Sequence, residues 1–120
     1  MIILVTGGRD YNDRKAVHAT LAALHKANPI QILIHGRAAG ADSLAAAWAM
    51  NQGIHTAGVP AIWNVYGRLG GTRRNGAMLL LKPELVVAFP GGRGTANMVA
   101  QARHSAIKVI MVDNYDLVSS

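Results

Sequence analysis

The residues best suited to binding chemistry stand together in the run Phe89-Pro90-Gly91-Gly92-Arg93-Gly94-Thr95. An apolar segment with the pattern of a buried strand precedes this run, and a helical pattern follows it. Backbone N–H groups converge where a helix begins, and the partial positive charge there favours phosphate. Glycine lets a ligand approach the backbone because no Cβ blocks it. An ordinary turn would require fewer special residues. We therefore predict a phosphate site formed by Pro90, Gly91, Gly92, Arg93, Gly94 and Thr95.

Two other glycine-rich loops, 7–8 and 36–40, also follow apolar segments that are predicted to be strands. Carboxyl ends of parallel strands lie at one edge of a sheet, so the three loops should converge on one crevice. Six of the eight arginines fall in or beside these loops, whereas the four lysines lie elsewhere. The guanidinium fork suits phosphate oxygens, although arginines could simply prefer exposed loops. These six are Arg9, Arg37, Arg68, Arg73, Arg74 and Arg93.

Hydrophobic periodicity predicts the elements that must position these loops. The expected strands are residues 2–6, 30–34, 54–59, 84–89 and 107–112. The expected helices are residues 13–27, 42–51, 72–81 and 95–105, with Asn12 or Asp13 capping the first. Residues 60–72 are expected to form an irregular loop and residues 113–120 a tail. This alternation predicts one α/β domain over residues 1–120, with a five-stranded parallel sheet flanked by helices on both faces.

Composition narrows the class of protein. Half of the residues are apolar and 15% are charged, which is typical of a compact globular protein. No apolar stretch is long enough to span a bilayer, and Met1–Val5 lacks a signal-peptide pattern. The absence of cysteine fits a reducing compartment, so we expect a cytoplasmic protein without a membrane partner. The five histidines show no metal-ligand spacing, so we expect no metal and no required cofactor. The net charge of +6 favours an anionic partner.

Several motifs, taken in order along the chain, resemble the SLOG superfamily. The run 90–95 resembles its PGGxGT motif, and the other motifs look more specifically like its small YspA-type branch. Those motifs are Val5-Thr6-Gly7-Gly8-Arg9-Asp10-Tyr11, His35-Gly36 with Gly40-Ala41-Asp42, Pro60-Ala61 with Trp63, and Arg74-Asn75 with Met78. The resemblance covers nearly the whole chain. It implies a Rossmann-like fold that binds nucleotides or nucleotide-derived ligands such as AMP, ADP-ribose or NAD fragments.

The chain departs from the enzymes of that superfamily at one position. In the LOG-type phosphoribohydrolases the motif continues to a catalytic glutamate three residues after the threonine, and an upstream arginine assists. Arg74 matches the arginine, but Met98 stands where the glutamate is expected. A thioether can neither accept a proton nor stabilise an oxocarbenium ion by charge. The catalytic residues are therefore unknown, with Arg74 and Asp42 as candidates.

The acidic and imidazole groups near the loops have alternative roles. Asp42 could cap the helix that follows it or accept a hydrogen bond from a ribose hydroxyl, and we favour either role over catalysis. Asp10 is expected to fix the first loop by pairing with Arg9 or Arg37. His35 follows a buried strand directly, and a structural hydrogen bond is favoured over a role as a base.

The remaining site residues follow from these loops. Gly7, Gly8 and Arg9 should form the wall beside the phosphate loop. Gly36 and Asp42 should face the ribose, and Arg37 should also bind the ligand. Arg74 should clamp the anion, and Asn75 should bind the same ligand or hold the turn. Trp63 and Tyr66 could stack on the base. Equally, Trp63 could only anchor the irregular loop to the core.

Three functions fit these expectations. The first is a nucleotide-binding module that senses, carries or sequesters a small phosphorylated nucleoside. The second is an enzyme that cleaves the N-glycosidic bond of a nucleoside monophosphate. The third is binding of single-stranded DNA, which is suggested by the net charge and by the DNA-processing protein DprA in the same superfamily. We place it last because the positive charge gathers at loops and the chain has only six aromatic residues. The apolar runs 45–50 and 77–81 also suggest a homodimer or a larger homo-oligomer.

Overall fold

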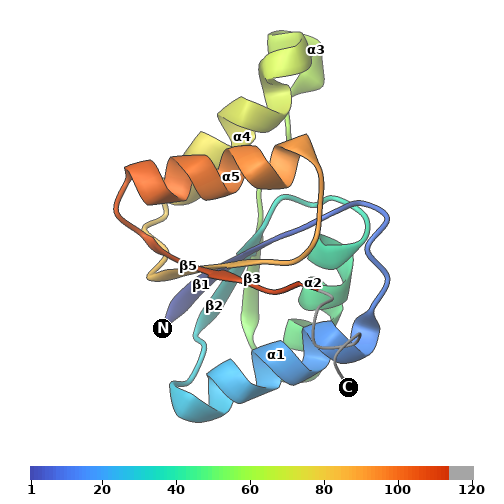
Figure 1. Ribbon diagram of the computed structural model, residues 1–120, viewed down its shortest axis with the longest axis vertical. Helices are drawn as coiled ribbons and strands as arrows, with labels where there is room; N and C mark the ends of the chain where they lie inside the picture. Colours follow the sequence, from blue (N-terminus) through green and yellow to red (C-terminus); the bar gives the residue numbers. More distant parts are fainter. Residues whose placement is uncertain (114–120) are drawn as a thin grey trace.

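A computed structural model describes residues 1–113 and contains a five-stranded sheet in which all neighbouring strands are parallel (Figure 1). The strand order is β3-β2-β1-β4-β5. The strands are β1 (Ile2–Thr6), β2 (Ile32–His35), β3 (His55–Gly58), β4 (Leu85–Ala88) and β5 (Lys108–Met111). The helices are α1 (Arg14–Ala27), α2 (Ala41–Asn51), α3 (Trp63–Tyr66), the 3-10 turn η1 (Gly67–Leu69), α4 (Gly70–Leu79) and α5 (Arg93–His104). The tail expected over residues 113–120 lies outside the described residues, apart from Asp113.

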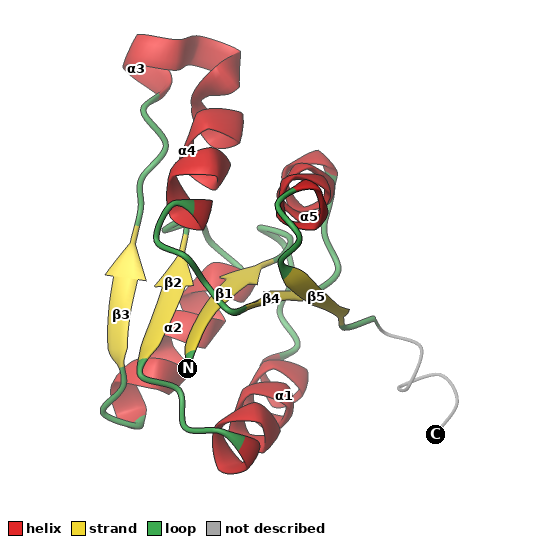
Figure 2. Cartoon of the chain, turned by 90° about the vertical axis from the view of Figure 1, so that its left-hand side faces the viewer, coloured by secondary structure: helices red, strands yellow, loops and turns green. Residues whose placement is uncertain are grey.

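Helices cover both faces of the sheet. Helices α1 and α2 lie on one face and α4 and α5 on the other, while α3 lies beyond the carboxyl end of β3 (Figure 2). The predicted α/β class, with a parallel sheet between two helical layers, is confirmed. After β3 the chain returns to the other side of β1, so the strand order reverses between β1 and β4. The loops that follow these two strands lie at the place where α/β sheets bind ligands.

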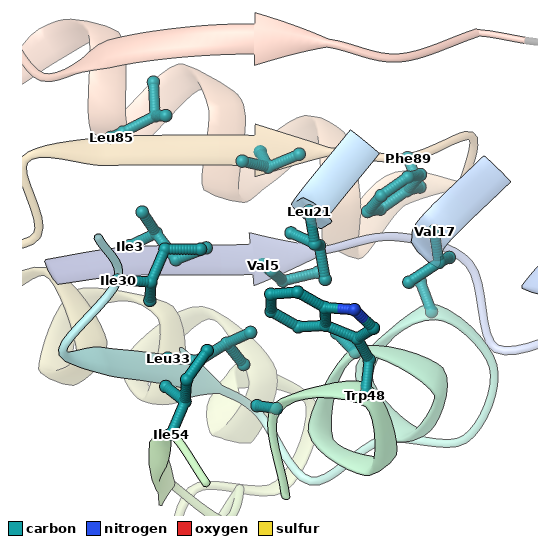
Figure 3. Packing of buried hydrophobic residues seen from close by; sticks show 14 residues of the cluster. Ile3, Val5, Val17, Leu21, Ile30, Leu33, Trp48, Ile54, Leu85 and Phe89 are labelled. Atoms are coloured by element: carbon teal, nitrogen blue, oxygen red, sulfur yellow. The ribbon is translucent and has the colours of Figure 1, made fainter. Parts of the chain in front are cut away.

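Alternate residues of the central strands point into separate cores. Ile3 and Val5 of β1 pack with Val17 and Leu21 of α1 in the core beneath α1 and α2 (Figure 3). Leu4, between them in the sequence, packs against α4 and α5 on the opposite face. Side chains of a strand alternate between the two faces, and both faces are covered here. This is why the strands read as continuous apolar runs in the sequence.

The first helix begins and ends where local signals predict. Asp13 is its N-cap, and the carboxylate accepts a hydrogen bond from the Ala16 N–H at 3.0 Å. Asn28, in extended conformation before Pro29, ends the helix. The second strand starts two residues later than predicted. The Ile30 N–H donates to His25 Nδ1 at 2.9 Å instead of joining the sheet.

The segment over residues 60–72 is more regular than expected. It contains α3 and η1, and α4 begins at Gly70 and ends at Leu79, instead of running from residue 72 to 81. The start of this helix was not predicted because glycine has a low helix propensity. Here the glycines make room for Trp63: an ideal Cβ on Gly70 would lie 2.7 Å from the Trp63 ring. Within residues 1–113, no helix is both long and apolar enough to cross a membrane.

Candidate functional site

The loops after β1 and β4 are joined directly at the edge of the sheet. The Gly8 N–H donates to the Pro90 carbonyl at 2.8 Å. A Cβ on Gly91 would collide with Thr95 Oγ1 and would lie 2.7 Å from the Gly8 nitrogen. Gly91 is therefore required for the close approach of the two loops. The loop after β2 joins them through Gly40, whose φ is +74° and whose Cβ would collide with the Gly8 carbonyl.

The three loops and α4 enclose a pocket of about 480 Å³, which we call the main pocket. Most of the residues expected at the site from the sequence line it. They are Gly7, Gly8, Arg9, Asp42, Trp63, Arg74, Asn75, Gly92, Arg93, Gly94 and Thr95. The three glycine-rich loops therefore meet at one crevice, and four of the six arginines expected there line it: Arg9, Arg68, Arg74 and Arg93.

Other expected residues lie beside the main pocket. Gly36 and Arg37 line an adjoining cavity of about 420 Å³, which shares Arg9, Trp63 and Arg74 with the main pocket. Pro90 and Gly91 line a cavity between α5 and β5. Tyr66 and Arg73 line a third, larger cavity at α3 and α4. The Arg73 guanidinium stands 5.6 Å from the Tyr66 ring centre.

Sequence reasoning missed several residues of the main pocket, because they come from elements whose faces could not be assigned from the pattern. They are Thr6, Ala38, Gly71, Thr72, Met78 and Asn97. Arg68 also lines the main pocket, and it was one of the six arginines expected near the crevice. Asn97 had a usable signal, since it lies one helical turn after Gly94 on α5. Met98, the next residue, is fully buried in the core between the sheet and α5. Met98 therefore contributes nothing to the main pocket.

Asp42 is a buried carboxylate that organises the loop before α2. Its Oδ2 accepts hydrogen bonds from the Gly36 N–H at 2.7 Å and from the Ala38 N–H at 3.3 Å. The expected helix cap is not observed, because α2 begins after Gly40 without a side-chain cap. Burial raises the pKa of Asp42, and the two backbone hydrogen bonds oppose that rise by favouring the ionised form. Its Oδ1 accepts none of the hydrogen bonds found within residues 1–113.

Arg74 is the cation most tightly held at the main pocket. Its Nη1 donates to the Gly36 carbonyl at 2.5 Å, and its Nε donates to Asn75 Oδ1 at 3.1 Å. Both partners are neutral, and Nη2 makes no hydrogen bond within the described part of the chain. Burial lowers the pKa of Arg74, while Asp42 opposes this by favouring the charged form. A half-buried cation with neutral partners favours an anionic ligand.

Three further candidates lie near the pocket: His35, Asp10 and Trp63. His35 Nδ1 accepts a hydrogen bond from the Arg37 N–H at 3.1 Å, and burial lowers the pKa of its ring. Within residues 1–113, Asp10 forms no ion pair with Arg9 or Arg37, so the expected pairing is not observed. Trp63 is about half exposed, and stacking of its ring on a base stays a prediction. It packs on the glycines of α4, and its ring faces the Arg9 guanidinium at 6.0 Å in the main pocket.

The fold and the crevice define a Rossmann-like domain with a cationic pocket at the switch in strand order. A family model described as the YspA, cpYpsA-related SLOG family matches residues 1–66. "Gene 61 protein" of Mycobacterium phage D29 is 34% identical over 116 residues, which cover 90% of this chain and 93% of that protein. The chain belongs to the YspA, cpYpsA-related SLOG family. This membership suggests a role in nucleotide-related binding or catalysis. The run 90–95 lies outside the residues that the family model matches.

Proposed function

We propose that the main pocket binds the phosphate and ribose of a nucleotide or nucleotide-derived ligand, such as AMP, ADP-ribose or an NAD fragment. In this proposal the protein acts as a sensor, carrier or sequestering module. One observation carries it: Arg9, Arg68, Arg74 and Arg93 line a pocket to which the described residues contribute one carboxylate. Like charges held close together repel, and an anionic occupant relieves that repulsion. Membership of the SLOG family supports a nucleotide as that anion.

The single carboxylate supports a ribose next to the phosphate. Asp42 uses Oδ2 to hold the Gly36–Ala38 loop, while Oδ1 is free of hydrogen bonds within residues 1–113. A carboxylate oxygen at the pocket wall can accept hydrogen bonds from a ribose hydroxyl. The base would then extend toward Trp63, whose half-exposed ring also lines the pocket. In this arrangement Gly92, Gly94 and Thr95 contact the phosphate.

The alternative is a phosphoribohydrolase-like enzyme, and one observation favours it. Burial raises the pKa of Asp42, which favours the protonated form that a general acid requires. Asn97, not an acid, is the side chain that the first turns of α5 direct to the pocket near Thr95. An enzyme would therefore need Asp42 as its acid. Incubation with AMP separates the two functions, because only hydrolysis releases free adenine.

The first test is mass spectrometry of the small molecule released when the purified protein is denatured. A near-stoichiometric adenine nucleotide or ADP-ribose derivative supports the binding module, whereas a free base or ribose phosphate supports turnover. Arg74→Ala should weaken binding of the identified ligand by roughly 1.5–3 kcal/mol, the range for a charge-assisted hydrogen bond. An empty protein that no nucleotide stabilises would refute the proposal. A salt-dependent shift of a single-stranded oligonucleotide would then favour DNA binding.

A further inference from the structure

Asn75 is a buried amide whose hydrogen bonds connect two walls of the main pocket. It is 3% exposed and lies in the middle of α4. Its Oδ1 accepts from Arg74 Nε at 3.1 Å, and its Nδ2 donates to the Gly94 carbonyl at 3.2 Å and to Asn97 Oδ1 at 3.1 Å. An arginine can only donate and a backbone carbonyl can only accept. The orientation of the amide is therefore fixed by its partners.

The contacts of Arg74 extend this connection to the loop after β2. Arg74 Nη1 donates to the Gly36 carbonyl, while Asp42 accepts from the Gly36 N–H. The Gly36 carbonyl is thus bound by a cation and the Gly36 N–H by a carboxylate. Charge-assisted hydrogen bonds of this kind are the stronger ones in proteins. Arg74 is therefore fixed to the loop at one end and to Asn75 at the other.

At its far end the network returns to α4. Asn97 Oδ1 also accepts from Gln101 Nε2 at 2.7 Å, and the same nitrogen donates to the Thr72 carbonyl at 3.2 Å. Helices α4 and α5 are therefore tied together by side chains as well as by packing. Asn75, at the centre of this network, is buried, and hydrogen-bond networks around a buried group restrict the geometry of their members. The first turn of α5 and the guanidinium of Arg74 consequently share one rigid support.

We propose that Asn75 is a positioning residue that holds Arg74 and the first turn of α5 at a fixed separation, so that one anionic group of the ligand contacts both. The inference rests on the proposed function and adds that the anion is bound jointly by these two walls. Preorganised groups bind more tightly because less freedom is lost on binding. A ligand without the anion gains little from this arrangement.

The test compares AMP with adenosine, which lacks the phosphate. Asn75→Ala removes the contacts to both walls, and we expect the Kd for AMP to rise roughly tenfold or more, as for loss of a hydrogen bond to a charged group. The Kd for adenosine should change less than about twofold. Arg74→Lys keeps the positive charge but loses the Nε contact with Asn75, and it should weaken AMP binding similarly. Asn51→Ala, at the exposed last residue of α2, is the matched control and should bind both ligands as the wild type does.

A double-mutant cycle separates positioning from a general loss of structure. In the Arg74→Lys background, Asn75→Ala should add less than about a twofold loss of AMP affinity, because the two residues act as one unit. Three results would each overturn the inference. The losses of AMP affinity in the two single variants could add in the double variant, or Asn75→Ala could weaken the binding of AMP and adenosine equally. A folded Asn75→Ala protein could also bind AMP as the wild type does. If Asn75→Ala does not fold, wild-type affinity in Arg74→Lys overturns it instead. A wild-type protein that binds no nucleotide refutes the proposed function itself.

Discussion

Aspartate in place of Gly92 is expected to stabilise the fold and to prevent anion binding. Gly92 is the N-cap of α5, and no side chain caps this helix. The first backbone hydrogen bond of α5 runs from the Ala96 N–H to the Gly92 carbonyl at 3.0 Å, so the N–H groups before Ala96 have no partner within the helix. An ideal Cβ on Gly92 would meet nothing within 4 Å. The new carboxylate could therefore accept hydrogen bonds from the same N–H groups that we assign to the phosphate.

The magnitude follows from helix capping. Aspartate and asparagine are better N-caps than glycine by a few tenths of a kcal/mol. A negative charge at a helix N-terminus adds about 0.3–1 kcal/mol. We expect Gly92→Asp to raise the free energy of unfolding by about 1 kcal/mol, or roughly 4 °C for a domain of this size. Gly92→Asn should raise the free energy of unfolding less, because asparagine caps the helix but carries no negative charge. Gly92→Asp should also abolish nucleotide binding, because its charge repels phosphate in the site.

Urea unfolding and calorimetric titration with AMP measure the two effects on the same samples. Gly92→Val is the apolar control: it should also abolish binding, with little loss of fold, because its side chain occupies phosphate space. The reasoning fails if Gly92→Asp is less stable than Gly92→Asn at low salt. The phosphate assignment fails if all three variants bind AMP as the wild type does.

Three further predictions concern other parts of the molecule. Gly91→Ala should cost about 1–3 kcal/mol in urea unfolding, because its Cβ has no room beside Thr95, and equal stability would contradict this packing. Burial raises the pKa of Asp42, so as the pH rises above the ordinary aspartate value of about 4 the wild type should lose stability relative to Asp42→Asn, because the carboxylate ionises less readily in the folded state. A stability difference in urea unfolding that stays constant as the pH rises from this value would refute the prediction. The predicted homo-oligomer should depend on Leu80, which is 80% exposed and lines the large cavity at α3 and α4. Sedimentation should show that Leu80→Glu dissociates it while Ala22→Glu, an exposed change on α1 outside both apolar runs, does not.

The fold was predictable because its strands carry a strong and redundant signal. The central strands β1 and β4 are covered on both faces, so apolar residues such as Ile3, Leu4 and Val5 follow one another without a polar break. The short segment from 60 to 72 was not predictable as helix. There the sequence reflects a tertiary contact, since Gly70 is small because Trp63 packs on it. The hydrophobic pattern within the segment gives no sign of this contact.

The parts of the site that depend on the path of the backbone were predictable from the sequence. The parts that depend on the direction of individual side chains were less predictable. The loops converge because parallel strands end at one edge, and this needs only the order of elements. The roles of Asp42 and Asn97 depend on which way a helical side chain points. Asp42 was expected either to cap α2 or to accept a hydrogen bond from a ribose hydroxyl. The cap is not observed, because Oδ2 accepts from the Gly36 and Ala38 N–H groups instead. Asn97 faces the pocket and Met98 faces the core, a difference of one residue that a weak helical pattern does not resolve.

The helices differ in whether a side chain caps the N-terminus, and this difference indicates where a more stable cap is absent in favour of binding. Helix α1 lies outside the main pocket and has a side-chain cap from Asp13. Helices α2 and α5 begin at the pocket, and both have glycine N-caps without a side-chain hydrogen bond. At α2 the close approach of Gly40 to Gly8 explains the glycine. At Gly92 no neighbour excludes a side chain, so packing does not account for it. A position that departs from a local rule without a structural reason is typical of a functional site. The open N-terminus of α5 is therefore the part of the pocket where a bound anion would best explain the choice of residue.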